Sequence, residues 1–129
     1  MDVNWLAVIA AALSSFPLGF LWYGPLFGKA WAAEVGMTDE KAKSGNPAIV
    51  FGGAFVLALI QAATFAMFLG AEPLPNAAVY GLLAGLCWVG TAFGVQYLFE
   101  RKSWKLTAIN AGYNGIAFTL VGAIIGAWR

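Results

Sequence analysis

The segment SWKLTAINAGYNGIAFTLVGAIIGAWR, at positions 103–129, contains about 22 consecutive residues without a formal charge. At about 1.5 Å of rise per residue, a helix of this length crosses the roughly 30 Å hydrocarbon core of a bilayer. A Trp–Lys pair precedes the uncharged run and a Trp–Arg pair follows it, as in a span anchored at both interfaces. The segment therefore predicts a membrane-spanning helix from about 105 to 127.

The whole chain has the composition of an integral membrane protein. Of its 129 residues, 61% are hydrophobic and 10% are charged, whereas a soluble domain usually carries about 25% charged residues. Three further apolar runs predict spans at about 4–23, 48–69 and 77–99. The predicted fold is therefore all-α, with a single transmembrane domain over 1–129 in which four helices form an antiparallel bundle.

The connections between the spans hold most of the polar residues. The stretch GMTDEKAKSGN at 36–46 predicts a solvent-exposed loop, in which Thr38 caps a brief helical turn. The segment LFGKAWAAEV at 26–35 is amphipathic and too short to span, so it predicts a short interfacial or re-entrant helix. We expect the first span to be uncleaved, because Asp2 stands where a secretory signal carries positive charge.

The basic residues predict how the chain threads the membrane. Four spans place the connection before the second span and the connection before the fourth span on the same side. By the positive-inside rule this side is cytoplasmic, so both termini are periplasmic in a bacterial inner membrane. Six of the seven basic residues lie at these two connections: Lys29, Lys41, Lys43, Arg101, Lys102 and Lys105.

Aromatic residues predict the same threading, because tryptophan and tyrosine gather at both membrane interfaces. Trp5, Tyr80 and Trp128 are expected at the outer interface. Trp31 and Lys29 are expected at headgroup level, where Arg101, Lys102 and Lys105 offer a site for an anionic lipid. The inner interface is predicted to hold Trp22, Tyr23, Tyr97 and Trp104.

Polar side chains recur within the predicted spans. Asn110 and Asn114 are spaced i, i+4 and share a helix face, and Gln61 lies near the depth of Asn114. Two interpretations stay open: interhelical hydrogen bonds, worth about 0.6 kcal/mol each in a membrane, or a seam that binds a small solute or headgroup. The predicted polar seam comprises Gln61, Thr91, Gln96, Asn110, Tyr113 and Asn114.

Small residues recur at four-residue spacing on the third and fourth spans, where they let helix backbones approach closely. This pattern predicts either packing of these two helices within one chain or a glycine face that contacts another protein chain. The predicted helix-contact residues are Gly81, Gly85, Gly90, Gly94, Gly112, Gly122 and Gly126.

Two motifs resemble a known family. LGFLWYGPLFGKAW at 18–31 resembles a signature of the type LWYSP-LFGKAW, and YLFERKSWKLTAINAGYNGIAFTLVGAIIGAW at 97–128 resembles a closing motif containing LINAGY. Both are typical of the bacterial four-span membrane proteins catalogued as domain of unknown function 1761. The resemblance implies four spans but no activity, and this chain has Asn114 where many members have histidine. The matching residues are Trp22, Tyr23, Pro25, Gly28, Lys29, Trp31, Leu98, Phe99, Glu100, Asn110, Ala111, Gly112 and Tyr113.

The sequence offers few groups for catalysis. One cysteine and no histidine exclude most zinc, haem and iron–sulfur ligand sets, and a net charge of +1 gives no electrostatic reason to bind nucleic acid. We therefore predict no cofactor, no metal and no catalytic residue. The carboxylates fall in loops or at interfaces without an obvious pair: Asp2, Glu34, Asp39, Glu40, Glu72 and Glu100.

These observations predict a non-enzymatic membrane protein that acts through helix–helix contacts. It would be an accessory subunit of a larger membrane complex, of respiratory or photosynthetic type, or a homo-oligomer, with lipids and other membrane protein chains as partners. One alternative is a small-solute transporter or channel, which requires a cavity that reaches Asn114 or Gln61. Another is an anionic-lipid binder near Lys102 and Lys105.

Overall fold

Four apolar helical runs make up most of the fold. The computed structural model describes residues 3–128, so Asp2 and Arg129, used in the sequence arguments, lie outside the described residues. Within 3–128 every regular element is helical, which confirms the all-α fold class. The runs long and apolar enough to cross a membrane are Trp5–Leu26, Pro47–Leu69, Asn76–Glu100 and Trp104–Ala127.

The first and third of these spans each contain a π-helical segment, and two short helices connect the first span to the second. In chain order the elements are α1 (Trp5–Leu21), η1 (Trp22–Leu26), α2 (Gly28–Val35), α3 (Asp39–Ser44), α4 (Pro47–Leu69), α5 (Asn76–Leu83), η2 (Ala84–Gly90), α6 (Thr91–Glu100) and α7 (Trp104–Ala127).

The first span is longer than the sequence predicted. The sequence predicted its end at about residue 23, but the helix continues through Gly24 and Pro25 to Leu26. The amide of Phe27 donates to the carbonyl of Trp22 at 2.8 Å, five residues back. This wider turn accommodates the proline ring, which lacks an N–H donor and clashes with the carbonyl four residues back in an α-helix.

Local side chains mark the starts of three helices. Thr38 accepts a hydrogen bond from the amide of Lys41 at 3.2 Å, which caps the predicted helical turn as α3. Ser103 accepts from the amide of Leu106 at 3.4 Å and caps α7. Pro47 is the first residue of α4, a position that tolerates its missing donor.

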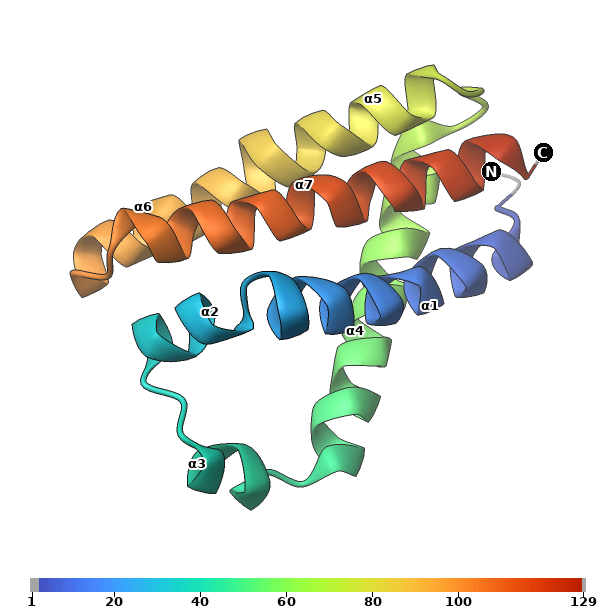
Figure 1. Ribbon diagram of the computed structural model, residues 1–129. Coiled ribbons are helices and arrows are strands. Elements are labelled where there is room, and N and C mark those ends of the chain that lie inside the picture. Colours follow the sequence, from blue (N-terminus) through green and yellow to red (C-terminus); the bar gives the residue numbers. More distant parts are fainter. Residues whose placement is uncertain (1–2, 129) are drawn as a thin grey trace.

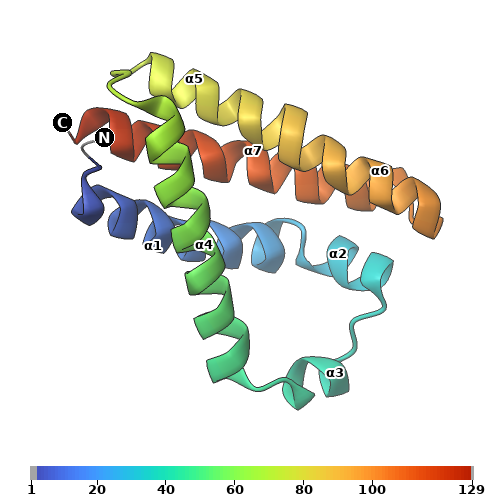
Figure 2. The same ribbon diagram turned by 180° about the vertical axis from the view of Figure 1, so that it is seen from behind.

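The helix α7 lies in the middle of a three-helix layer. It is flanked by α1 on one side and by the run of α5, η2 and α6 on the other, and both flanking runs are antiparallel to it (Figure 1). The helix α4 crosses α1 and α7 obliquely, as the opposite view also shows (Figure 2). The four-span bundle is therefore a layer of three helices with the fourth laid across it.

Hydrogen bonds between remote segments fix the two ends of the layer. Nδ2 of Asn4 donates to the carbonyl of Trp128 at 2.9 Å, so the first and last spans meet at one end. Oγ of Ser103 donates to the carboxylate of Glu34, so α2 and the turn before α7 share the other end. The two basic connections thus lie at one end of the layer, as the predicted threading requires.

The helix α2 continues in the direction of α1 and does not turn back into the bundle (Figures 1 and 2). It therefore extends the first span beyond Leu26 and packs beside α7.

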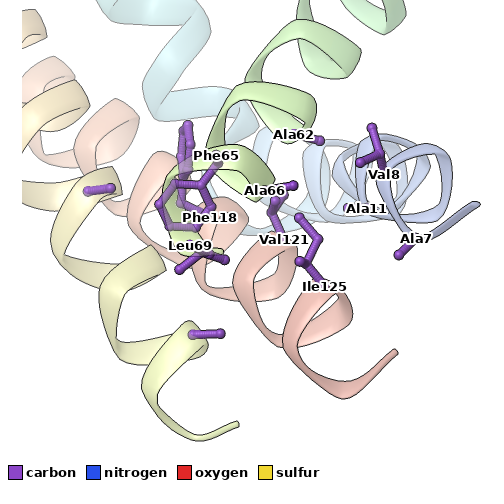
Figure 3. Packing of buried hydrophobic residues seen from close by; sticks show 12 residues of the cluster. Ala7, Val8, Ala11, Ala62, Phe65, Ala66, Leu69, Phe118, Val121 and Ile125 are labelled. Atoms are coloured by element: carbon purple, nitrogen blue, oxygen red, sulfur yellow. The ribbon is translucent and has the colours of Figure 1, made fainter. Parts of the chain in front are cut away.

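The hydrophobic core lies toward the end of the layer where Asn4 meets Trp128. Figure 3 shows its side chains from close by. It forms where the second half of α4 crosses α1 and α7. Phe65 and Phe118 meet edge to face there, with ring centroids 5.6 Å apart. The small side chains of Ala7 and Ala11 are fully buried, which lets α4 approach α1 closely. The buried cluster comprises Ala7, Val8, Ala11, Ala62, Phe65, Ala66, Leu69, Ala77, Ala84, Phe118, Val121 and Ile125.

The first half of α4 takes no part in this core. No residue from 47 to 61 is buried, whereas Ala62, Phe65, Ala66 and Leu69 are. The helix therefore diverges from the layer toward its own start (Figure 2).

Candidate functional site

A cleft of about 720 Å³ lies between the diverging half of α4 and the layer formed by α1 and α7. Gln61 lines it from α4, and Asn110, Tyr113 and Asn114 line it from α7. Four of the six residues of the predicted polar seam therefore meet at one cavity. This is the feature that the solute-binding alternative required.

Most of the cleft wall is apolar. Two of its lining rings, Phe20 of α1 and Phe51 of α4, contact each other with their centroids 5.9 Å apart. Phe20 is 62% exposed and Leu57 is 63% exposed, so the rim is accessible from outside the chain. Within residues 3–128, no charged side chain lines the cleft. The site is therefore suited to a largely apolar ligand with few polar groups.

Asn110 joins three helices at one end of the cleft. Its Oδ1 accepts a hydrogen bond from the Tyr23 hydroxyl at 2.5 Å, and its Nδ2 donates to the Tyr97 hydroxyl at 2.7 Å. The asparagine is only 8% exposed. Interhelical hydrogen bonding is thus the role that the structure shows for Asn110.

The other two polar groups of α7 are each bonded once. The Tyr113 hydroxyl donates to the carbonyl of Ser15 at 3.1 Å, and Nδ2 of Asn114 donates to the carbonyl of Asn110 at 2.8 Å. A carbonyl only accepts, so this bond assigns Nδ2 and Oδ1 of Asn114. Oδ1 of Asn114 has no partner among the described residues, and it is not a buried atom.

Gln61 lies well inside the second span with its side chain exposed. No hydrogen bond joins its side chain to any other residue from 3 to 128. An amide without a partner in hydrocarbon is unfavourable, because no water is present there to replace the missing bonds. Gln61 and Oδ1 of Asn114 are therefore two open polar positions on one cleft.

Thr91 and Gln96 do not belong to this site, which corrects the predicted seam. The Thr91 hydroxyl donates back to the carbonyl of Cys87 at 2.5 Å, and Gln96 is exposed on α6. The π-helical segment η2 lies before both residues. It changes the angular position of everything after it, so counting along an ideal α-helix assigned them to the wrong face.

The sequence did not identify three groups that hold this site together. Tyr23 and Tyr97 were placed at the inner interface, but their hydroxyls bond to Asn110 from two different helices. The carbonyl of Ser15 is engaged by Tyr113. The only available signal was that Asn110, inside a span, requires partners.

Trp31, which the sequence predicted at headgroup level, also lines the cleft. It lines the cavity from α2, and its ring meets that of Tyr23 edge to face at 5.5 Å between centroids. It therefore forms part of the cleft wall at the α2 end.

The predicted helix-contact glycines face each other inside the chain. A Cβ atom on Gly81 would lie 2.1 Å from the carbonyl oxygen of Phe118, and one on Gly122 would lie 2.1 Å from that of Ala77. The backbones of α5 and α7 are thus in direct contact. These glycines therefore make close contacts between two spans of the same chain, as the intrachain alternative describes.

The remaining predicted glycines also contact other parts of the chain, at distances that differ from one glycine to the next. Gly85 meets the backbone of Asn114, Gly90 meets Ala111, and Gly126 meets the Cβ of Ala77. Gly94 has the most room, because a Cβ atom added to it would lie 3.4 Å from a methyl of Thr107. Gly112 instead faces the indole of Trp22, and Gly115, which was not predicted, packs on Leu86.

The basic residues remain on the surface. Lys29, Arg101, Lys102 and Lys105 are exposed. Arg101 and Lys102, with Leu98 and Phe99, line a shallow depression of about 610 Å³ at the turn before α7. No ion pair is formed there among the described residues. Residues 3–128 also contain no group of three or more side chains able to hold a metal ion.

These features define a multi-pass helical membrane protein with an apolar cleft in the side of its bundle. The chain belongs to a family described as protein of unknown function (DUF1761), whose family model matches residues 6–126. This match confirms the resemblance carried by the two terminal motifs. No curated protein and no solved structure shows significant similarity to the chain.

Proposed function

We propose that this protein binds a small molecule inside the membrane and acts as a non-enzymatic carrier for it. The observation that supports this function is the cleft between α1, α4 and α7, which reaches both Gln61 and Asn114. Its size is in the range of ligand pockets, which run from about 300 to 1,000 Å³. An apolar wall with a few polar groups is typical of such pockets.

Carrying is favoured over an accessory-subunit role because of the glycine contacts. The expectation of a partner chain rested largely on glycine faces of the third and fourth spans. In the structure, the glycines on those faces contact other helices of the same chain. The prediction of a respiratory or photosynthetic complex therefore has no support from them.

A homo-oligomer remains a second candidate because of a different surface. Gly52 and Gly53 lie in the diverging half of α4, and a Cβ atom at either position would meet nothing within 4 Å. Ile49 beside them is 72% exposed. Small residues on a free helix let another helix approach. A Gly52→Cys chain in a Cys87→Ala background would cross-link to itself in native membranes if this candidate is right.

We propose a bacterial inner membrane as the location, with both termini periplasmic. The support is that α2 and the turn before α7, near which six basic residues lie, share one end of the layer. The positive-inside rule assigns that end to the cytoplasm. Lipids are its expected partners, and the exposed Arg101 and Lys102 suit an anionic headgroup as a secondary contact.

The carrier proposal is tested by blocking the cleft. Ala54 lines the cleft from α4, whereas Gly53 is its neighbour and does not. We expect native mass spectrometry of the mildly extracted wild-type protein to show a small molecule bound to each chain. The same molecule should remain on a Gly53→Trp variant and be lost from Ala54→Trp. Equal occupancy of the two variants, or a wild-type chain that carries nothing, contradicts the proposal.

A further inference from the structure

The cleft combines a large apolar wall with two open polar positions and no charge among the residues described. We infer that its occupant is an uncharged amphiphile from the bilayer whose head carries a hydroxyl or amide N–H donor. This inference rests on the proposed carrier function and names the class of molecule carried.

The absence of charged lining residues from 3 to 128 argues for an uncharged occupant. An ion moved from water into an apolar site loses its hydration, and only a partner of opposite charge compensates for that loss. The exposed cations Arg101 and Lys102 line a separate depression with Leu98 and Phe99, not the cleft. A charged head would therefore be unpaired in the cleft.

The hydrogen-bond arrangement argues for a donor on the head. The bond from Nδ2 of Asn114 to the carbonyl of Asn110 uses one of its two N–H groups and identifies Oδ1 as an acceptor without a partner. Only a hydrogen-bond donor on the ligand can pair with that oxygen. Gln61, across the cleft on α4, offers a donor and an acceptor, so it tolerates either kind of group. A head with acceptors alone would leave Oδ1 of Asn114 without a hydrogen bond.

The exposed rim argues for entry from the bilayer. The packing contacts of α4 are made chiefly with α1 and α7, and the side of the cleft toward α6 is bordered by Phe93. Phe20, Phe51 and Leu57 at the rim are exposed apolar side chains within the spans. In a membrane such side chains face acyl chains, so an amphiphile already dissolved in the bilayer reaches the cleft without crossing water.

Three probes with one hydrocarbon chain and different heads test this class. Oleyl alcohol carries a hydroxyl donor, oleyl methyl ether carries an acceptor only, and oleyl sulfate carries a permanent charge. We expect titration by native mass spectrometry in detergent to show the alcohol binding about 5-fold more tightly than the ether, from one added hydrogen bond. The sulfate should bind most weakly.

Variants of the two open polar positions localise the effect. In Asn114→Leu the alcohol and the ether should bind about equally, because the acceptor for the hydroxyl is gone. Continued binding of the ether would show that the cleft is still formed. Gln61→Leu breaks no hydrogen bond of the side chain and should weaken binding of the alcohol and of the ether to a similar extent, because Gln61 accommodates either head. Gln96→Leu, on α6 outside the cleft, should leave the preference unchanged.

The outcomes separate the two proposals. Equal binding of alcohol and ether, or tightest binding of the sulfate, overturns the inferred class. If all three probes bind equally and Ala54→Trp removes them, the carrier function stands and this inference fails. If none binds and the wild-type chain still carries a molecule that Ala54→Trp removes, only this inference fails; if the wild-type chain also carries nothing, both fail. A Gln61→Cys chain in a Cys87→Ala background that cross-links to itself would show a second copy in the cleft, which also overturns the inference.

Discussion

The hydroxyl of Tyr23 donates a hydrogen bond to Oδ1 of Asn110 across 2.5 Å, although the two residues are 87 positions apart in the chain. The same asparagine donates to Tyr97 from its other side-chain atom. One amide thereby connects the first, third and fourth spans at one end of the cleft. Several measurable consequences arise from this bond and from the other contacts described above.

Removing the Tyr23 hydroxyl should lower the stability of the bundle. A Tyr23→Phe variant leaves Oδ1 of Asn110 without its donor, so we expect the free energy of unfolding to fall by about 0.6 kcal/mol, with an upper limit near 1.7. Unfolding by SDS in mixed micelles, followed by circular dichroism, measures it. Tyr80→Phe is the matched control, because the exposed Tyr80 forms no hydrogen bond among the residues described. Equal loss in both variants would argue against the bond.

Glycine substitutions should follow the closeness of the helix contact. Gly81→Ala places a methyl 2.1 Å from the Phe118 carbonyl, so the helices must separate, and we expect a loss of about 1–3 kcal/mol. Gly94→Ala should be close to neutral, since its nearest neighbour is a methyl at 3.4 Å. The same SDS titration compares them. Gly53→Ala, which meets nothing, should be neutral or stabilising. A reversed order would contradict the intrachain packing.

The contact between Glu34 and Ser103 predicts a specific cross-link. In a Cys87→Ala background, the pair Glu34→Cys and Ser103→Cys should be joined by a short bifunctional thiol reagent in native membranes. The product is detected as a shift in electrophoretic mobility. Ala71→Cys with Ser103→Cys should give no product, because these residues lie at opposite ends of the layer. Cross-linking of the control pair instead would mean that the spans are threaded differently.

The proposed orientation predicts which connections a membrane-impermeant thiol reagent reaches. Gly45 and Ala71 are both exposed, and they lie at the two ends of α4. In a Cys87→Ala background, Ala71→Cys should be labelled in intact spheroplasts, and Gly45→Cys only after lysis. Labelling of Gly45→Cys first would reverse the assignment of the two sides.

Patterns that depend on the chain alone were readable from the sequence. The length of each uncharged run predicted the four spans, and Thr38 marked the start of a short helix that the structure contains as α3. The resemblance of both terminal motifs agreed with the family match over residues 6–126. These features are local, so no knowledge of neighbouring helices was necessary.

Features that depend on neighbouring helices were not readable. The spacing of Gly81 and Gly85 indicated a close contact but not which helix supplies it, because any helix backbone satisfies the same requirement. Thr91 was assigned to the wrong face because a π-helical segment precedes it. The oblique course of α4 was also missed, and with it the cleft, since an apolar helix gives no sign of which half is packed.

The contact of Gly81 with the carbonyl of Phe118 has a consequence for motion. Where two backbones touch, no side chain stands between them to rearrange, so the third and fourth spans should move as one rigid body. The helix free to move relative to that body is then α4. Its last turn is held in the core at Leu69 and is followed by Gly70, which has a positive φ of 59°. We expect the cleft to widen and narrow by a swing of α4 about that pivot, with the loose end travelling farthest.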